Sequence, residues 1–179
     1  MKDIRKIKET ILTYLNQTGI PLSRVVGDGM KEKAVAGFSM NLDVPPFILF
    51  GPFQDMTREV VSIVHEAGHV MVYKELSMDD ARMYLCTMFV TKGIGLAEVS
   101  PKGQESILRA EAGASASGFS ILKEIRVDNE YLEVARKLMS QWYSTYEKLC
   151  NEAVVKKVRD RIIKDANFAF LSRDPSAHH

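Results

Sequence analysis

The sequence predicts an α+β fold, in which a small antiparallel or mixed sheet near the N-terminus precedes a helical second half. Short apolar segments separated by proline and glycine turn signals occupy the chain before Asp55, and helical periodicity follows it almost without interruption. The chain has 179 residues, and 46% of them are hydrophobic, which suffices for one domain with a substantial core. We expect this domain to cover residues 1–170 and residues 171–179 to form a polar C-terminal tail.

The N-terminal part is predicted to contain one helix and three short strands. Apolar residues recur at helical spacing through the first 18 residues, which predicts an amphipathic helix. Turn signals then frame two strands, at residues 23–26 and 34–42. Prolines on both sides isolate a third strand, residues 47–50, because proline cannot donate to a ladder. We favour an ordinary core strand there, over an edge strand on which an extended peptide could add.

From Asp55 onward we expect helices. Asp55 or Thr57 can cap a helix that continues to about Glu75. A second helix follows, and residues 91–103 then break the periodicity, so they are expected to form an irregular connection. A long third helix should begin after Ser100, because proline fits the first helical turn. One or two further helices complete the domain.

Composition indicates an ordinary globular protein. The net charge is +1, so we expect no nucleic-acid partner, and the basic segment at 156–164 is read as a solvated helix face. No run of about 18 apolar residues exists, so no membrane span is expected. The first 15 residues are charged at helical intervals, which argues against a signal peptide.

Cys86 and Cys150 are too few for a disulfide framework, so we expect two buried thiols and a cytoplasmic location.

The stretch from His65 to His69 carries the pattern H-E-x-x-H. Residues four apart lie about 40° apart around a helix axis, so both histidines project from one face and can bind one Zn²⁺. Glu66 lies about 100° from His65, where it can act as general base on a metal-bound water. The alternative is a pair of hydrogen-bonded core histidines. Flanking valine and isoleucine predict a buried helix, in which unpartnered His and Glu would be costly, and this favours the metal.

A catalytic zinc site needs a third protein ligand. The other two histidines, His178 and His179, belong to the predicted tail. Glu75 would require a break in a helix that has no breaker, and Asp79 and Asp80 are expected to serve a helix cap. The third ligand is therefore expected to be a carboxylate from another helix.

Glu111 is our choice for this ligand. It begins the segment 111–118, in which every later residue is alanine, glycine or serine. Such small residues let two helix backbones approach closely, and Gly68 offers a matching position on the motif helix. The alternative is that these residues only permit tight packing while Glu111 faces solvent. Glu105 and Glu124, on the same helix, are the reserve ligands.

Two segments carry a resemblance to a known family. "VVSIVHEAGHVM" resembles the zincin metallopeptidase consensus, and "RAEAGASASGF" is similar to the glutamate-bearing helix of the gluzincin branch, with alanine three residues after the glutamate. With the small size and the leading strands, residues 20–125 resemble the ImmA/IrrE family of bacterial and phage-associated metallopeptidases. The resemblance implies a zincin-like active-site helix, one Zn²⁺, and cleavage of a protein, in some members a transcriptional regulator.

We therefore expect a zinc endopeptidase that hydrolyses a protein or peptide substrate. His65, His69 and Glu111 would hold Zn²⁺, and Glu66 would take a proton from water and return it to the leaving amine. The candidates for stabilising the oxyanion are Arg109, Tyr131, Tyr143 and Tyr146. Two alternatives stay open: a metal-binding regulatory module that binds a protein partner without cutting it, and structural histidines that bind no metal.

Overall fold

The computed structural model describes residues 3–39 and 44–162, with only the backbone described at 89–93. Within these ranges the chain forms six α-helices and one small, three-stranded mixed sheet, so the α+β class is confirmed. The predicted tail lies outside the described residues. No helix in the described ranges is both long and apolar enough to cross a bilayer.

The sheet lies near the N-terminus, after the first helix. Helix α1 is Ile4–Gln17, and the strands are β1 (Leu22–Arg24), β2 (Ala34–Gly37) and β3 (Phe47–Phe50). The strand order is β1-β3-β2, with β1 parallel and β2 antiparallel to β3. β3 is therefore the central strand, with Ile48 and Phe50 buried, and the edge-strand alternative for residues 47–50 is wrong. β2 is an edge instead; it ends at Gly37, earlier than predicted.

Five further α-helices follow the sheet in the described chain. They are α2 (Met56–Glu75), α3 (Met78–Ile94), α4 (Pro101–Glu124), α5 (Asn129–Leu149) and α6 (Glu152–Ile162). The predicted helix starts form: of the two cap candidates it is Asp55 whose carboxylate accepts the backbone N–H groups of Thr57 and Arg58, and the helix after Ser100 is capped by the Ser100 hydroxyl, which accepts the N–H of Gly103. The irregular connection is shorter than expected, because α3 continues to Ile94.

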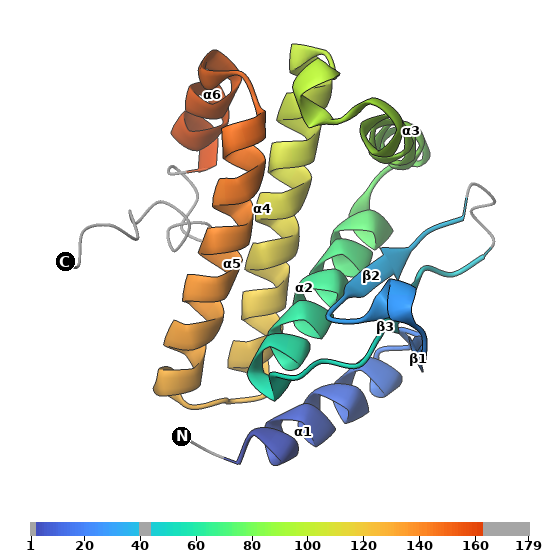
Figure 1. Cartoon of the computed structure of the whole chain (residues 1–179), viewed down its shortest axis with the longest axis vertical. Helices are drawn as coiled ribbons and strands as arrows, with labels where there is room; N and C mark the ends of the chain where they lie inside the picture. Colours follow the sequence, from blue (N-terminus) through green and yellow to red (C-terminus); the bar gives the residue numbers. More distant parts are fainter. Residues whose placement is uncertain (1–2, 40–43, 163–179) are drawn as a thin grey trace.

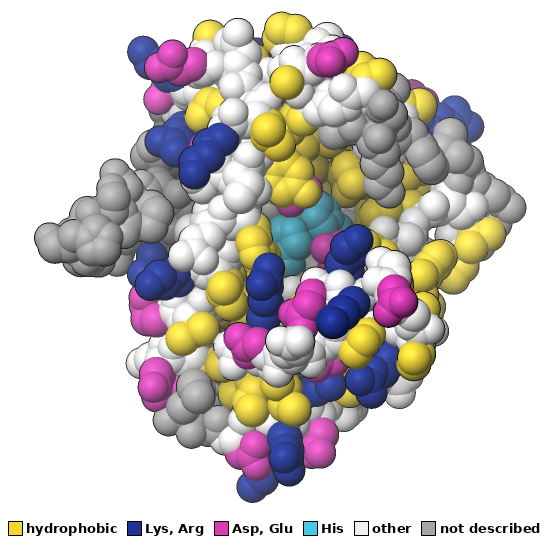
Figure 2. All heavy atoms as spheres, in the orientation of Figure 1, with side chains coloured by type: hydrophobic (Ala, Val, Ile, Leu, Met, Phe, Trp, Pro, Cys, Tyr) yellow, Lys and Arg dark blue, Asp and Glu magenta, His cyan; other side chains and the backbone are white. Residues whose placement is uncertain are grey.

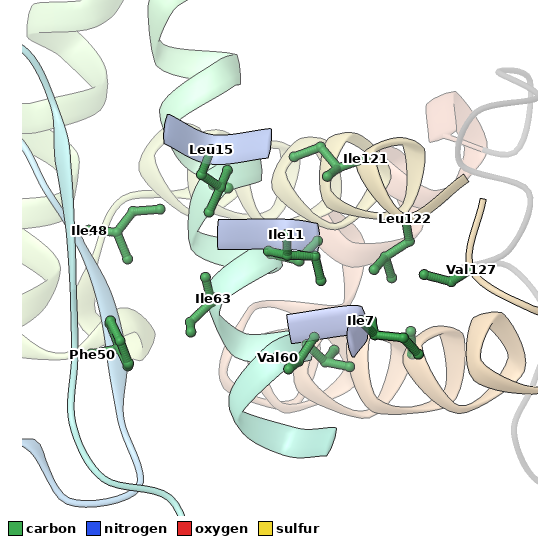
Figure 3. Close-up of a cluster of buried hydrophobic side chains, with 14 of the residues drawn as sticks. Ile7, Ile11, Leu15, Ile48, Phe50, Val60, Ile63, Ile121, Leu122 and Val127 are labelled. Carbon is green, nitrogen blue, oxygen red and sulfur yellow. The ribbon is translucent and has the colours of Figure 1, made fainter. Parts of the chain in front are cut away.

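One apolar cluster holds α1, the sheet, α2 and α4 together (Figure 3). Ile7, Ile11 and Leu15 lie one helical turn apart on α1 and are each at most 3% exposed. Full burial of one such side chain stabilises the fold by about 1.5–3 kcal/mol. α2 thus lies between the sheet and α4, with α5 on the far side of α4 (Figure 1). The motif helix is therefore in the middle of the molecule.

The two cysteines differ from expectation. Cys86, on α3, is exposed and Cys150 is half-buried, so the prediction of a buried thiol is wrong for Cys86. α3 carries apolar residues around most of its circumference, and such a helix gives no periodic signal for which face is inside.

Candidate metal centre

α2 and α4 approach each other closely at positions that carry no side chain. A Cβ added at Gly68 would lie 1.9 Å from the carbonyl oxygen of Ala114, and one added at Gly118 would lie 2.7 Å from that of Val64. Both distances are shorter than real Cβ contacts. The predicted close approach of the small-residue segment to Gly68 is confirmed, and it brings residues of α4 against the motif.

The structure brings His65, His69 and Glu111 together. Glu111 Oε2 lies 3.3 Å from His65 Nε2 and 3.5 Å from His69 Nε2, and one ligand atom from each residue lies within 4.8 Å of the others. All three side chains are buried. A tetrahedral ion with bonds of about 2.0–2.1 Å needs ligand atoms about 3.3–3.5 Å apart. The two distances from Glu111 Oε2 match this spacing, so these three side chains are a candidate zinc site.

The two reserve ligands are engaged elsewhere. Glu105 pairs with Lys157 of α6, at 2.6 Å, and with Arg161. Glu124 accepts a hydrogen bond from the Tyr14 hydroxyl of α1 at 2.9 Å. Of the three glutamates considered on α4, Glu111 is the one that meets the histidines.

Hydroxyl groups contact the far ring nitrogen of each histidine. The Ser115 hydroxyl lies 3.3 Å from His65 Nδ1, and the Tyr84 hydroxyl lies 3.0 Å from His69 Nδ1. Such partners fix the tautomer and the ring orientation of a metal-binding histidine, and here they leave both Nε2 atoms toward Glu111. Ser115 could have been found from the sequence, since it is four residues after Glu111. No spacing in the sequence relates Tyr84 to the motif, so its contact with His69 could not have been found in this way.

The charges of the three predicted ligands are coupled. Burial alone would raise the pKa of Glu111, but the charge and hydrogen bonds of the two histidines hold it well below its ordinary value. Burial would lower the pKa of His69, and the Glu111 carboxylate more than compensates, so this pKa is raised. The carboxylate therefore needs positive charge beside it. Protonation of His69, which its raised pKa favours, supplies that charge in the metal-free protein, and a divalent cation can supply it when the ring is neutral.

Glu66 lies beside this cluster and is half-buried. Its Oε2 accepts a hydrogen bond from the backbone N–H of Ala36, in β2, at 2.7 Å. Burial raises the pKa of Glu66, although the two histidines and the Ala36 N–H act in the opposite direction. A carboxylate with a raised pKa is suited to general-base work near neutral pH. The contact with Ala36 was not predicted.

α5 contributes aromatic side chains to the cluster. The Trp142 ring stands edge-on to the His65 ring, with centroids 5.7 Å apart. Burial raises the pKa of the Tyr146 hydroxyl, and the Glu111 charge and a hydrogen bond to Glu111 raise it further. The remaining oxyanion candidates are exposed Arg109 and the buried residues Tyr131 and Tyr143. Tyr146 is therefore the best placed of the four.

The cluster opens to the surface at the bottom of a hollow. Figure 2 shows histidine side chains there, and the described histidines are His65 and His69. A separate groove, of 2040 Å³, reaches Tyr84 but is lined by none of the three candidate ligands. Its lining includes Arg109, Gly113 and Ser120, which are about 160–200° around α4 from Glu111. The large groove therefore runs along the opposite face of α4.

No protein family, curated protein or solved structure matches this chain. The chemistry of the site has to be argued from its own residues.

Proposed function

We propose that this protein is a zinc-dependent endopeptidase. The observation that carries the proposal is the convergence of His65, His69 and buried Glu111 on one point, with Glu66 beside them. Three protein ligands are what a catalytic zinc site needs, since the fourth position stays open for water or substrate. The H-E-x-x-H motif on a buried helix and the glutamate on a second helix agree with the resemblance to gluzincins and to the ImmA/IrrE family.

Each residue has a separate task in this mechanism. His65, His69 and Glu111 would hold the ion, which supplies Lewis acidity and lowers the pKa of water. Glu66 accepts the proton of the attacking water and returns it to the leaving amine. The raised pKa of Tyr146 keeps its hydroxyl protonated, so it can transfer its hydrogen bond from Glu111 to the oxyanion that develops on the carbonyl oxygen.

The proposed substrate is a protein or peptide that binds in an extended conformation beside β2, without pairing to the Ala36 N–H that Glu66 occupies. This edge strand contacts the general base through Ala36, and Val35 is 40% exposed on it. A transcriptional regulator is the substrate that the family resemblance suggests. We propose a cytoplasmic location on the basis of cysteine usage. Nucleic acid is not proposed, because the α6 residues Lys157 and Arg159 form ion pairs within the chain.

The test combines zinc content with hydrolysis of an unstructured protein such as casein. Glu66→Gln should keep stoichiometric zinc and lower kcat about 10²–10⁴-fold, because it removes the base and leaves the ligands. Glu111→Gln should lose zinc, whereas the matched control Glu124→Gln, on the same helix, should retain it.

Two results would contradict the proposal. A folded, zinc-loaded Glu66→Gln protein that cleaves casein as fast as the parent would exclude Glu66 as the base. Stoichiometric zinc in a parent that cleaves nothing, but retains a protein partner intact, would favour the non-catalytic module.

A further inference from the structure

We propose that the backbone N–H of Ala36 is a positioning group for Glu66, so that the edge strand β2 holds the general base in place. Its kinetic consequence rests on the proposed peptidase function. The hydrogen bond itself does not, because it joins two groups of this chain and needs neither metal nor substrate.

The pairing of the sheet leaves this N–H facing away from β3. Paired residues in an antiparallel ladder alternate between those that exchange hydrogen bonds and those that do not. Gly51 donates to Lys33 at 2.9 Å, so residues 33 and 51 are a bonded pair. Ala36 is opposite Ile48, three positions further on and therefore a non-bonded pair. The N–H of Ile48 confirms this, since it donates to Pro21, on the β1 side, at 2.8 Å.

The outward N–H of an edge strand ordinarily donates to water or to another strand. In this protein the Ala36 N–H donates to Glu66 Oε2 instead, at 2.7 Å. A carboxylate acceptor makes this a charge-assisted hydrogen bond, which is stronger than a neutral one. It crosses from α2 to β2, so it ties the base to an element other than its own helix.

A glutamate side chain has three rotatable bonds, and its carboxylate can occupy many positions beside a metal site. The Ala36 N–H restricts Oε2 to one direction and leaves Oε1 for the proton of the attacking water. Misplacement of a reacting group by about 1 Å can cost on the order of 100-fold in rate. Ala36 therefore acts through Glu66: it positions the base and does not itself react.

Ala34 provides an internal control for Ala36. It is two residues earlier on β2, opposite Phe50, so its N–H faces the same edge. The two positions have the same residue type, the same strand and the same orientation. They differ in that Ala36 donates to Glu66.

The first experiment is amide hydrogen exchange on the zinc-free protein. The Ala36 amide should have a protection factor at least about tenfold above that of Ala34. Glu66→Ala should abolish this difference while the amides of Val35 and Gly37, which face β3, keep their protection. Equal protection of Ala34 and Ala36 in the parent, or no effect of Glu66→Ala on Ala36, would overturn the proposal.

The second experiment replaces the peptide N–H by an ester oxygen, with lactic acid incorporated at position 36 or at position 34. The ester at 36 should lower kcat on casein about tenfold, with KM and zinc content unchanged. In a Glu66→Gln background the same ester should have no further effect, as expected for two groups that act as one unit.

The outcomes separate this inference from the proposed function. Equal kinetic effects of the two esters, or an effect on KM alone, would refute a positioning role for Ala36. A parent that binds zinc but hydrolyses nothing would refute the peptidase, and with it the kinetic role. The exchange measurement would still decide whether Ala36 holds Glu66.

Discussion

A methyl group at position 68 should force α2 and α4 apart. A Cβ added there would lie 1.9 Å from the Ala114 carbonyl oxygen, whereas ordinary contact begins at 3.4 Å. The difference, about 1.5 Å, has to come from movement of the helices, because the obstructing atoms are backbone. Overpacking of this kind destabilises the fold by up to about 3 kcal/mol, whereas the higher helix propensity of alanine relative to glycine stabilises α2 by about 1 kcal/mol. We expect Gly68→Ala to lose about 2 kcal/mol and to melt about 4–8 °C lower.

The same movement should open the candidate metal site. Glu111 precedes Ala114 by less than one turn of α4, so it moves with it. Its Oε2 is now 3.3 Å from His65 Nε2 and 3.5 Å from His69 Nε2. A shift of about 1.5 Å takes these separations toward 5 Å, while metal sites tolerate about 0.2 Å in each bond. Zinc affinity should fall about 10–100-fold.

Gly113→Ala is the matched control, because it is the same substitution on the same helix pair. A Cβ at Gly113 would meet Val72 Cγ2 at 3.2 Å, which is a side-chain atom that can move aside by a few tenths of an ångström. This variant should be as stable as the parent or more stable by up to about 1 kcal/mol. Urea unfolding of the zinc-free proteins and zinc competition against a chromophoric chelator measure both effects. Equal stability and equal zinc affinity in the two variants would refute the reasoning.

Three further predictions concern the site. Tyr84→Phe and Ser115→Ala each remove a hydroxyl from a histidine Nδ1, so each should weaken zinc binding about tenfold in the same competition assay; an unchanged zinc Kd in both would contradict this. Tyr146→Phe removes a hydrogen bond to Glu111, so it should weaken zinc binding about tenfold as well; in the zinc-saturated protein it should lower kcat on casein about 10²–10³-fold if this hydroxyl stabilises the oxyanion, and an unaltered kcat would exclude it. In the zinc-free protein, the Glu111–His69 pair should stabilise the fold most between pH 4.5 and 6.5. The lowered pKa of Glu111 gives stability that is complete above 4.5 and lost as pH falls, and the raised pKa of His69 gives stability that is complete below 6.5 and lost as pH rises. Because the raised pKa of Glu66 lowers stability above pH 4.5 in both proteins, the maximum should appear in the difference between the parent and Glu111→Gln, measured by denaturant titration across pH.

The candidate ligand set could be predicted because each part of it has a local signature. The i, i+4 spacing of His65 and His69 places them on one helix face whatever the rest of the fold does. Glu111 could be chosen because small residues after it and Gly68 on α2 both favour close helix contact, which the structure confirms. The helix caps at Asp55 and Ser100 are likewise local.

Other parts of the site depend on contacts between distant segments. Tyr84 meets His69 only because α3 packs across the end of α2, and α3 has no distinct apolar face from which its orientation could be predicted. The contact of Ala36 with Glu66 involves a backbone N–H, which every residue except proline has, so no residue type marks it. The central position of β3 follows from long-range strand pairing, which its flanking prolines do not specify.

The hydrogen bond between Glu66 and Ala36 also has a consequence for solubility. An open strand edge is a template for pairing with another chain, and charged side chains that block the edge are a common protection against aggregation. The Glu66 carboxylate covers the Ala36 N–H in this way. Glu66→Ala would remove the charge and free the N–H together, so that variant should self-associate more readily. Glu66→Gln keeps an oxygen acceptor at the same place, and it is therefore the better inactive form in which to trap a bound substrate.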